Sequence, residues 1–215
     1  MKRIFWIILP MLMLVGCRHN KYHQYVISKN KQHWNQGLKN TTTKKEPSFG
    51  MMDYNNDPLT WQQFKAKNNL IILGTVVDYE KNRNQNIFPT TKVQVRIDKV
   101  LFGKKMNKYI TTTFPSGFGY ANEIELIDKT MNEEYFYQKN SFPLPKIGSK
   151  FVTGMNLLHG KYQVSSPLFN FWVLKNDRLK LNNLDLNDIK NDEKVSQLLD
   201  LTDFLNCKLN IGKNR

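Results

Sequence analysis

The sequence predicts a mainly β fold, a small barrel or sandwich of about six short strands. Two observations support this prediction. Residues 93–98 alternate apolar and polar side chains, a pattern typical of a strand with one buried face. Other short stretches rich in β-branched and aromatic residues recur along the chain and are separated by turn residues. Such spacing favours a β architecture over a helical one.

A short helix is expected to open the globular part. Asp57 and Pro58 suit an N-cap and a first helical turn, and apolar residues continue at helical spacing to Ala66. The candidate strands follow it, at residues 70–79, 91–103, 109–114, 150–155, 162–165, 171–174 and 178–181.

The C-terminal segment, residues 185–209, predicts an amphipathic helix. Its apolar side chains fall on one helical stripe, formed by Val195, Leu198, Leu199, Thr202 and Leu205. Acidic residues precede this stripe, where they complement the helix dipole. We expect this helix to pack against the strands.

The N-terminus has the pattern of a signal for secretion. Lys2 and Arg3 precede an apolar stretch at residues 4–15, and Gly16 and Cys17 follow it. The apolar stretch is short for a membrane-spanning helix. An uncleaved anchor or an ordinary secretory signal would also begin in this way, but neither needs a cysteine at this point.

The residues Leu14-Val15-Gly16-Cys17 resemble the lipobox of bacterial membrane lipoproteins of the Gram-positive type. The resemblance implies cleavage between Gly16 and Cys17 and a diacylglyceryl group on the Cys17 sulfur. Two acyl chains hold a protein on a membrane durably, whereas one does so marginally. The expected location is the extracellular face of the cell membrane.

Residues 17–52 are expected to form a flexible basic tether. This segment holds seven Lys and Arg against Glu46 alone, and its polar run at residues 40–45 offers little to pack. Its lysines are candidates for contact with anionic lipid or with a wall polymer. Removing residues 1–16 leaves 199 of the 215 residues and lowers the net charge from +14 to about +12. No nucleic-acid partner is expected. Asn and Ile are enriched beside Lys, which indicates that the codon usage of an A+T-rich genome, rather than nucleic-acid binding, accounts for the positive charge.

Three glycines carry a second resemblance, which covers roughly residues 58–181. Gly74 lies inside a strand, Gly103 ends another, and Gly148 precedes a third. This order resembles the OB-like barrels of surface lipoproteins of unassigned function. It implies an OB-like barrel of about six strands at residues 53–182, with a preceding short helix and a C-terminal amphipathic helix in an extension at 183–215. Netrin-like inhibitor domains have a similar strand pattern but are held by disulfides, and only Cys207 would remain beside a lipidated Cys17.

The long stretch at residues 115–145, together with Phe114 just before it, contains candidates for ligand binding. Aromatic side chains on the loop of such a barrel can stack on a sugar, a base or a peptide. These candidates are Phe114, Phe118, Tyr120, Tyr135 and Tyr137. The alternative is that these aromatic rings close the end of the barrel as core residues.

Evidence for catalysis or metal binding in the sequence is weak. Paired carboxylates in the same stretch would suit a hydrolytic enzyme, and they are Glu123, Glu125, Glu133 and Glu134. His19 and His23 have ligand spacing only if they lie on a helix, and His33 and His159 lack partners at any recognised spacing. Cys207 is expected to be a buried, unreactive side chain. No metal or other cofactor is expected.

The sequence therefore predicts a lipid-anchored surface protein with a non-enzymatic binding role. The alternative is a hydrolytic enzyme that uses the carboxylates of the 115–145 stretch. A transporter's solute-binding component is disfavoured, since 199 residues with one β-rich core do not suggest two lobes around a cleft.

Overall fold

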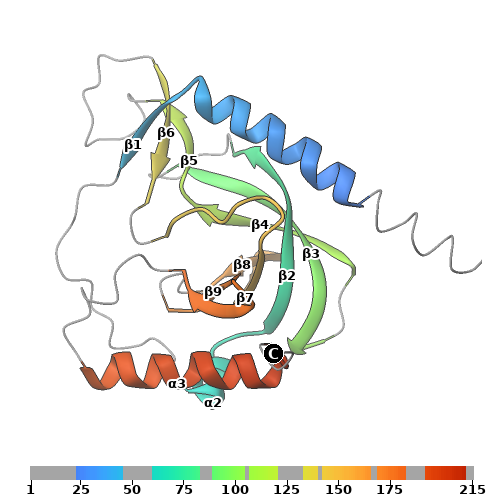
Figure 1. Cartoon of the computed structure of the whole chain (residues 1–215), viewed down its shortest axis with the longest axis vertical. Coiled ribbons are helices and arrows are strands. Elements are labelled where there is room, and N and C mark those ends of the chain that lie inside the picture. The colour runs from blue at the N-terminus through green and yellow to red at the C-terminus, as the bar shows by residue number, and fades with distance from the viewer. Residues whose placement is uncertain are drawn as a thin grey trace, which may run out of the picture.

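A computed structural model describes residues 23–45, 60–82, 89–104, 107–120, 133–139, 142–165, 169–182 and 192–211. In this part of the chain the protein is mainly β, with two sheets and a helix at each end (Figure 1). The predicted signal segment, Gly16 and Cys17 lie outside the described residues.

The larger sheet is built around β2 (Leu70–Lys81), which pairs with β3 (Thr90–Phe102) and with β7 (Lys150–Leu158). Its strand order is β10-β9-β7-β2-β3-β4, and β8 pairs with β7 beside this path. All of these pairings are antiparallel. The remaining strands are β4 (Tyr109–Pro115), β8 (Lys161–Val164), β9 (Phe171–Lys175) and β10 (Arg178–Leu181). Every strand expected from the sequence is therefore present.

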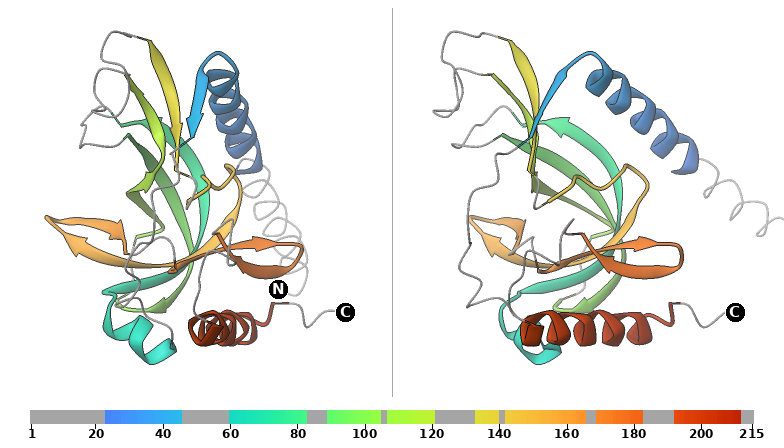
Figure 2. Two further views of the ribbon diagram at one scale, coloured as in Figure 1. Left: turned by 90° about the vertical axis from the view of Figure 1, so that its left-hand side faces the viewer. Right: turned by 60° about the vertical axis from the view of Figure 1, so that its left-hand side comes forward.

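The larger sheet is strongly curved (Figure 2). The pairing of β2 with β3 shifts register between Leu73 and Gly74. A Cβ at Gly74 would collide with the Val95 side chain, so only glycine fits this close approach. In the described part of the chain, no backbone pairing joins the edge strands β4 and β10. The sheet is thus curved and open.

Both faces of β2 are buried, each in a different hydrophobic core. Leu70, Ile72 and Val76 face a core on the inside of the curved sheet. Ile71 faces a second core on the outside, where it packs with residues of the two C-terminal elements. This arrangement explains the uninterrupted apolar run at the start of β2, because alternation is lost when both faces of a strand are covered.

Two helices cover the outer face of the sheet. Helix α2 (Trp61–Ala66) buries Phe64, and its N-cap is Thr60, whose hydroxyl accepts from the Gln63 N–H at 3.2 Å. The N-cap predicted at Asp57 is therefore wrong. The sequence Thr60-Trp61-Gln62-Gln63 is a capping box, a stronger signal than an Asp-Pro pair.

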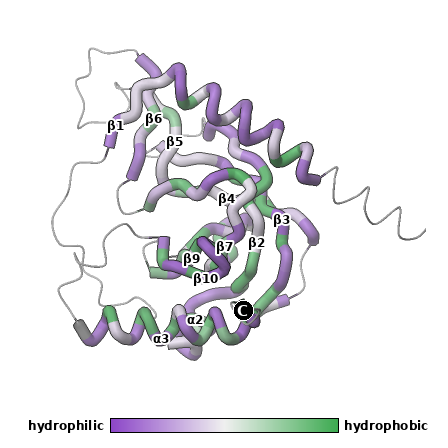
Figure 3. Tube along the Cα trace, viewed as in Figure 1, coloured by the Kyte–Doolittle hydropathy of each residue, from purple (hydrophilic) through white to green (hydrophobic). Residues whose placement is uncertain are grey.

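Helix α3 (Asp192–Lys208) confirms the predicted C-terminal helix and lies across one end of the sheet (Figures 1 and 2). Hydrophobic residues alternate with hydrophilic ones along it (Figure 3). Its buried stripe is Leu198, Leu201 and Leu205, whereas Leu199, expected on that stripe, is 50% exposed. The Trp172 indole N–H donates to the Thr202 hydroxyl at 2.9 Å and ties α3 to β9.

A second, three-stranded sheet was not predicted. It consists of β1 (Thr42–Lys45), β6 (Glu134–Gln138) and β5 (Gly117–Tyr120), with β1 parallel to β6 and β5 antiparallel to it. Ser116 links β4 to β5 and is buried, with its Oγ accepting from the Lys139 N–H at 2.9 Å. The stretch expected to be a long loop thus contains two short strands.

Residues 23–45 correct the prediction of a flexible tether. Residues 23–39 form a helix, and residues 42–45 form β1. The helix lies across the end of the molecule opposite α3 (Figure 1). Its buried side chain is Trp34, with Ile27 and Leu38 packed beside it. Apolar residues this widely spaced produce a weak hydropathy signal, yet they suffice because the rest of the fold presents an aromatic surface to them.

Candidate functional site

The candidate site lies between helix 23–39 and the segment 142–148. The helix turns Ile27, Trp34 and Leu38 toward the same side, because they are separated by seven and then four residues. Asn30 lies on that side too, and its amide donates to the Val77 carbonyl at 3.1 Å. This side of the helix therefore rests on β2.

Trp34 is the main contact between the helix and the two sheets. Its ring centroid lies 5.0 Å from that of Tyr79 on β2. It lies 5.2 Å from Phe118 on β5 and 6.3 Å from Phe136 on β6, both edge-to-face. Edge-to-face packing of this kind is favourable because the positive edge of one ring meets the negative face of another.

The opposite wall is held in place by hydrogen bonds to the backbone of the segment 142–148. The Tyr79 hydroxyl donates to the Pro145 carbonyl at 2.5 Å, and the Asn182 amide donates to the Pro143 carbonyl at 2.8 Å. The Gly148 N–H donates to the Val76 carbonyl at 2.8 Å. Two prolines restrict the backbone further, so this wall is preorganised.

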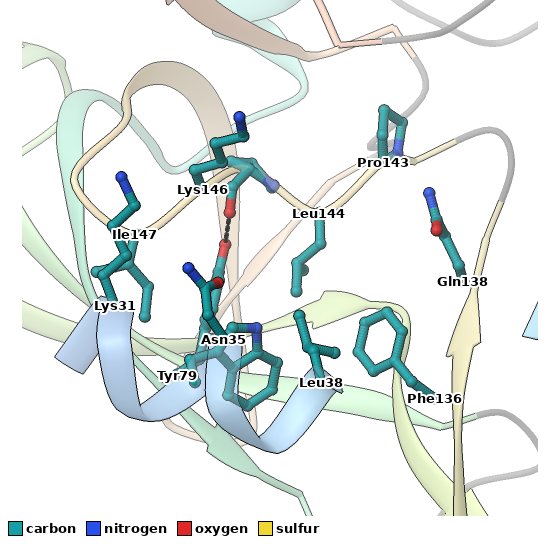
Figure 4. Close-up of a pocket in the computed structure, with 12 residues that line it drawn as sticks. Lys31, Asn35, Leu38, Tyr79, Phe136, Gln138, Pro143, Leu144, Lys146 and Ile147 are labelled. Atoms are coloured by element: carbon teal, nitrogen blue, oxygen red, sulfur yellow. Dashed lines mark hydrogen bonds between the residues drawn. The ribbon is translucent and has the colours of Figure 1, made fainter. Parts of the chain in front are cut away.

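Between these walls lies a cavity of about 320 Å³ (Figure 4). This volume is at the lower end of the range for small-molecule sites, about 300–1,000 Å³. Its lining residues are Lys31, Trp34, Asn35, Leu38, Tyr79, Phe136, Gln138, Pro143, Leu144, Pro145, Lys146 and Ile147. Most are apolar, and the polar ones are two amides, a phenol and two lysines. No Asp or Glu is among these residues.

Burial also changes the acid–base behaviour of two neighbouring groups. Desolvation raises the pKa of Tyr79 well above its usual 10.0, so its hydroxyl stays a hydrogen-bond donor. Desolvation likewise raises the pKa of Asp78 above 3.8, assisted by Glu80 and opposed by the Tyr79 N–H and by His33.

The aromatic residues predicted to bind a ligand are mostly core residues. Phe114, Phe118, Tyr135 and Tyr137 are each at most 5% exposed, whereas Tyr120 is 44% exposed. The first four offer no free ring face to a ligand. They are core residues at the end of the sheets, which was the alternative to ligand binding. Phe136, between two of them in sequence, is the one that lines the cavity.

The carboxylates considered for catalysis are only partly described. Glu123 and Glu125 lie outside the described residues. Glu133 is exposed, and Glu134 forms an ion pair with Lys81 at 2.6 Å. Among the residues that the structure describes, no three His, Cys, Asp or Glu side chains gather as metal ligands would.

The histidines and the second cysteine lie apart from the cavity. His19 is outside the described residues, His23 contacts Tyr109, and His159 lies in the turn between β7 and β8. His33 is exposed on the helix. Cys207 is exposed, so the prediction that it is buried is wrong. The stripe of α3 passes through Leu201 and Leu205, and position 207 falls outside it.

Sequence reasoning missed most of the cavity. The helix that forms one wall could have been recognised from Ile27, Trp34 and Leu38, which lie at helical spacing with Lys31 between them. The high overall polarity of this segment made that pattern hard to see. Pro143 and Pro145 were a second signal, since closely spaced prolines hold a backbone rigid.

In the described ranges, no helix combines the length and the apolar character needed to cross a membrane. Searches against protein-family models, curated proteins and solved structures returned no match to this chain.

Proposed function

We propose that this protein is a lipid-anchored surface lipoprotein that binds a ligand in the cavity under helix 23–39 and performs no chemistry on it. The observation that carries the binding role is the cavity itself. It has preorganised walls, an apolar lining and a few polar groups, which are the usual features of a small-molecule site.

The larger sheet supports an OB-like barrel as the architecture of this binding protein. The strands β8-β7-β2-β3-β4 follow one another in the order expected of such a barrel, and β8 lies near β4 at the open seam. OB-like barrels place ligands on one face and on adjacent loops. The proposed site differs, because an additional N-terminal helix creates it.

The anchor would keep the cavity near the membrane. Six residue steps separate Cys17 from residue 23, the first described residue of the helix, a span of at most about 20 Å. Eleven further helical residues lead to Trp34, about 16 Å along the axis. The exposed lysines of this helix, such as Lys29 and Lys39, would then face anionic headgroups or wall polymer.

Labelling of the full chain with a fatty acid during growth tests the anchor. Incorporation should be lost in Cys17→Ala and kept in Cys207→Ala, which removes the other cysteine. Equal labelling of Cys17→Ala and the unchanged chain would refute lipid attachment at this residue.

Binding to fractions of the cell surface tests the site. The full chain in membranes should retain a component of the lipid or wall fractions, and Leu144→Trp, which fills the cavity, should lose it. Leu158→Trp is the matched control, because Leu158 is 48% exposed on the β7–β8 hairpin and does not line the cavity. If both variants retain the component equally, the cavity is not the binding site.

A further inference from the structure

The two lysines of the cavity lining lie toward the same side of it. Lys31, Asn35, Lys146 and Ile147 lie toward that side in Figure 4, and Leu38, Leu144, Phe136 and Gln138 lie toward the other. Lys31 comes from the helix and Lys146 from the opposite wall. The two lysines thus belong to different walls of the same cavity, and both are exposed.

The charge of these lysines is not balanced within the cavity. Its lining residues include no carboxylate. The ion pairs found among the described residues join Lys81 to Glu134, Lys92 to Glu80 and Arg96 to Asp98, and none involves Lys31 or Lys146. A ligand with an anionic group would supply the missing negative charge.

We propose that the cavity binds an anionic single-chain amphiphile, a ligand class that rests on the proposed binding role. The carboxylate or phosphate head lies between Lys31 and Lys146, and the Asn35 amide is a further donor. The hydrocarbon chain lies against Trp34, Leu38, Phe136 and Leu144, which bury it from water.

Two features of the chain favour this occupant over a sugar or a peptide. The side of the cavity with Leu38, Leu144 and Phe136 offers aliphatic and aromatic surface and one amide, Gln138, rather than the several convergent hydrogen-bonding groups that a sugar would need. The proposed anchor at Cys17 also keeps the cavity within a few nanometres of the membrane, where amphiphiles are concentrated.

Photo-crosslinking in membranes that carry the full chain tests this proposal. The probe is a long-chain fatty acid with a photoreactive diazirine and an alkyne, and mass spectrometry identifies the labelled peptides. Label should appear in peptides from 23–39 and 142–148. Decanoate and decyl phosphate should both compete, whereas decanol should compete weakly and decyltrimethylammonium should not.

Variants test whether Lys31 and Lys146 bind the anionic head group of the ligand. Lys31→Gln and Lys146→Gln should each weaken apparent affinity about tenfold, the loss expected for one charge-assisted hydrogen bond. Lys161→Gln removes a charge from an exposed position on β8, outside the cavity, and should leave labelling unchanged. Circular dichroism should be the same for all three variants, since each changed side chain is exposed.

Three outcomes would overturn the ligand class. They are crosslinks confined to other segments, equal competition by decanol and decanoate, and full labelling of the Lys31→Gln, Lys146→Gln double variant. The two proposals can be told apart. If Leu144→Trp abolishes binding of a surface component but the fatty-acid probe does not label the cavity segments, the proposed binding role is supported and only the ligand class is refuted. The competition series uses the unchanged protein and so does not depend on any variant folding.

Discussion

The Trp34 indole lies 5.0 Å, centroid to centroid, from the Tyr79 ring, and this contact joins the N-terminal helix to the central strand β2. Trp34 is 8% exposed and Tyr79 is 5% exposed. The same two side chains line the cavity. Stability of the helix and the shape of the candidate site therefore depend on one aromatic pair.

Replacing Trp34 should detach the helix and destabilise the protein. Trp34→Ala removes the ring that meets Tyr79, Phe118 and Phe136, and such truncations cost about 3–5 kcal/mol. Urea unfolding measures the loss. Tyr25→Ala is the control on the same helix, because Tyr25 is 65% exposed, and it should change stability by at most about 0.5 kcal/mol. Similar values for the two variants would mean that the helix does not pack here.

Removing the Tyr79 hydroxyl should weaken the wall of the cavity. Tyr79→Phe deletes the donor to the Pro145 carbonyl, and an unsatisfied buried acceptor costs about 1–3 kcal/mol. Burial raises the pKa of Tyr79 above its usual 10.0, so the folded state favours the neutral phenol. This contribution is complete below about pH 10 and is lost as pH rises beyond it.

Unfolding free energies of the unchanged chain and Tyr79→Phe, measured from about pH 7 to about pH 11, test both statements. The difference between the two proteins should narrow at the alkaline end. Tyr25→Phe, at an exposed position, should match the unchanged chain at neutral pH. A constant difference across the range would contradict the role assigned to the neutral hydroxyl.

Neutralising Asp78 should stabilise the protein at neutral pH. Burial raises the pKa of Asp78 above its usual 3.8, so ionisation opposes folding. The penalty is absent below about pH 3.8, because the group is then protonated in both states, and it grows as pH rises through the folded pKa. Asp78→Asn should therefore raise the melting temperature near neutral pH and have little effect in acid.

Melting temperatures of Asp78→Asn and the unchanged chain, measured from acid to neutral pH, test this expectation. Asp203→Asn, at an exposed position on α3, is the control. A lower melting temperature for Asp78→Asn at neutral pH would show that the Asp78 carboxylate stabilises the fold, opposite to the expected sign.

Two glycine substitutions should have opposite effects. A Cβ at Gly154 on β7 would collide with the buried Asn68 amide, which donates to the Phe64 carbonyl at 2.7 Å, so Gly154→Ala should cost about 1–3 kcal/mol. Gly37 lies in helix 23–39, and a Cβ added there would have the Phe118 ring as its nearest neighbour, at 4.0 Å. Gly37→Ala should stabilise the protein by about 0.5–1 kcal/mol.

Thermal unfolding of the two alanine variants measures both changes. Destabilisation by Gly37→Ala would indicate that residues 23–39 are not helical in solution. A neutral Gly154→Ala would indicate that Asn68 moves aside without losing its hydrogen bonds.

Local patterns predicted most of the larger sheet. The alternation at residues 93–98 identified β3, and the apolar run after residue 70 identified β2, because strand residues with buried faces need apolar side chains there. The C-terminal helix was predictable for a similar reason, since its stripe repeats at helical spacing.

The second sheet and the helix at residues 23–39 were not predictable in this way. β1 is only four residues long and gains stability from pairing with β6, some ninety positions later in the chain. Helix 23–39 has few apolar residues and is held mainly by Trp34, whose partners lie on β2, β5 and β6. A single sequence window contains no information about such distant partners.

The sequence by itself determined the β-rich class, the strands of the larger sheet, the C-terminal helix and the lipobox-like residues around Cys17, because these depend on local composition and spacing. Only the tertiary structure decided that four of the candidate aromatics are buried and that Lys31 and Lys146 line one cavity. Burial and cavity shape depend on which distant segments meet, and here the meeting point is the contact between Trp34 and Tyr79.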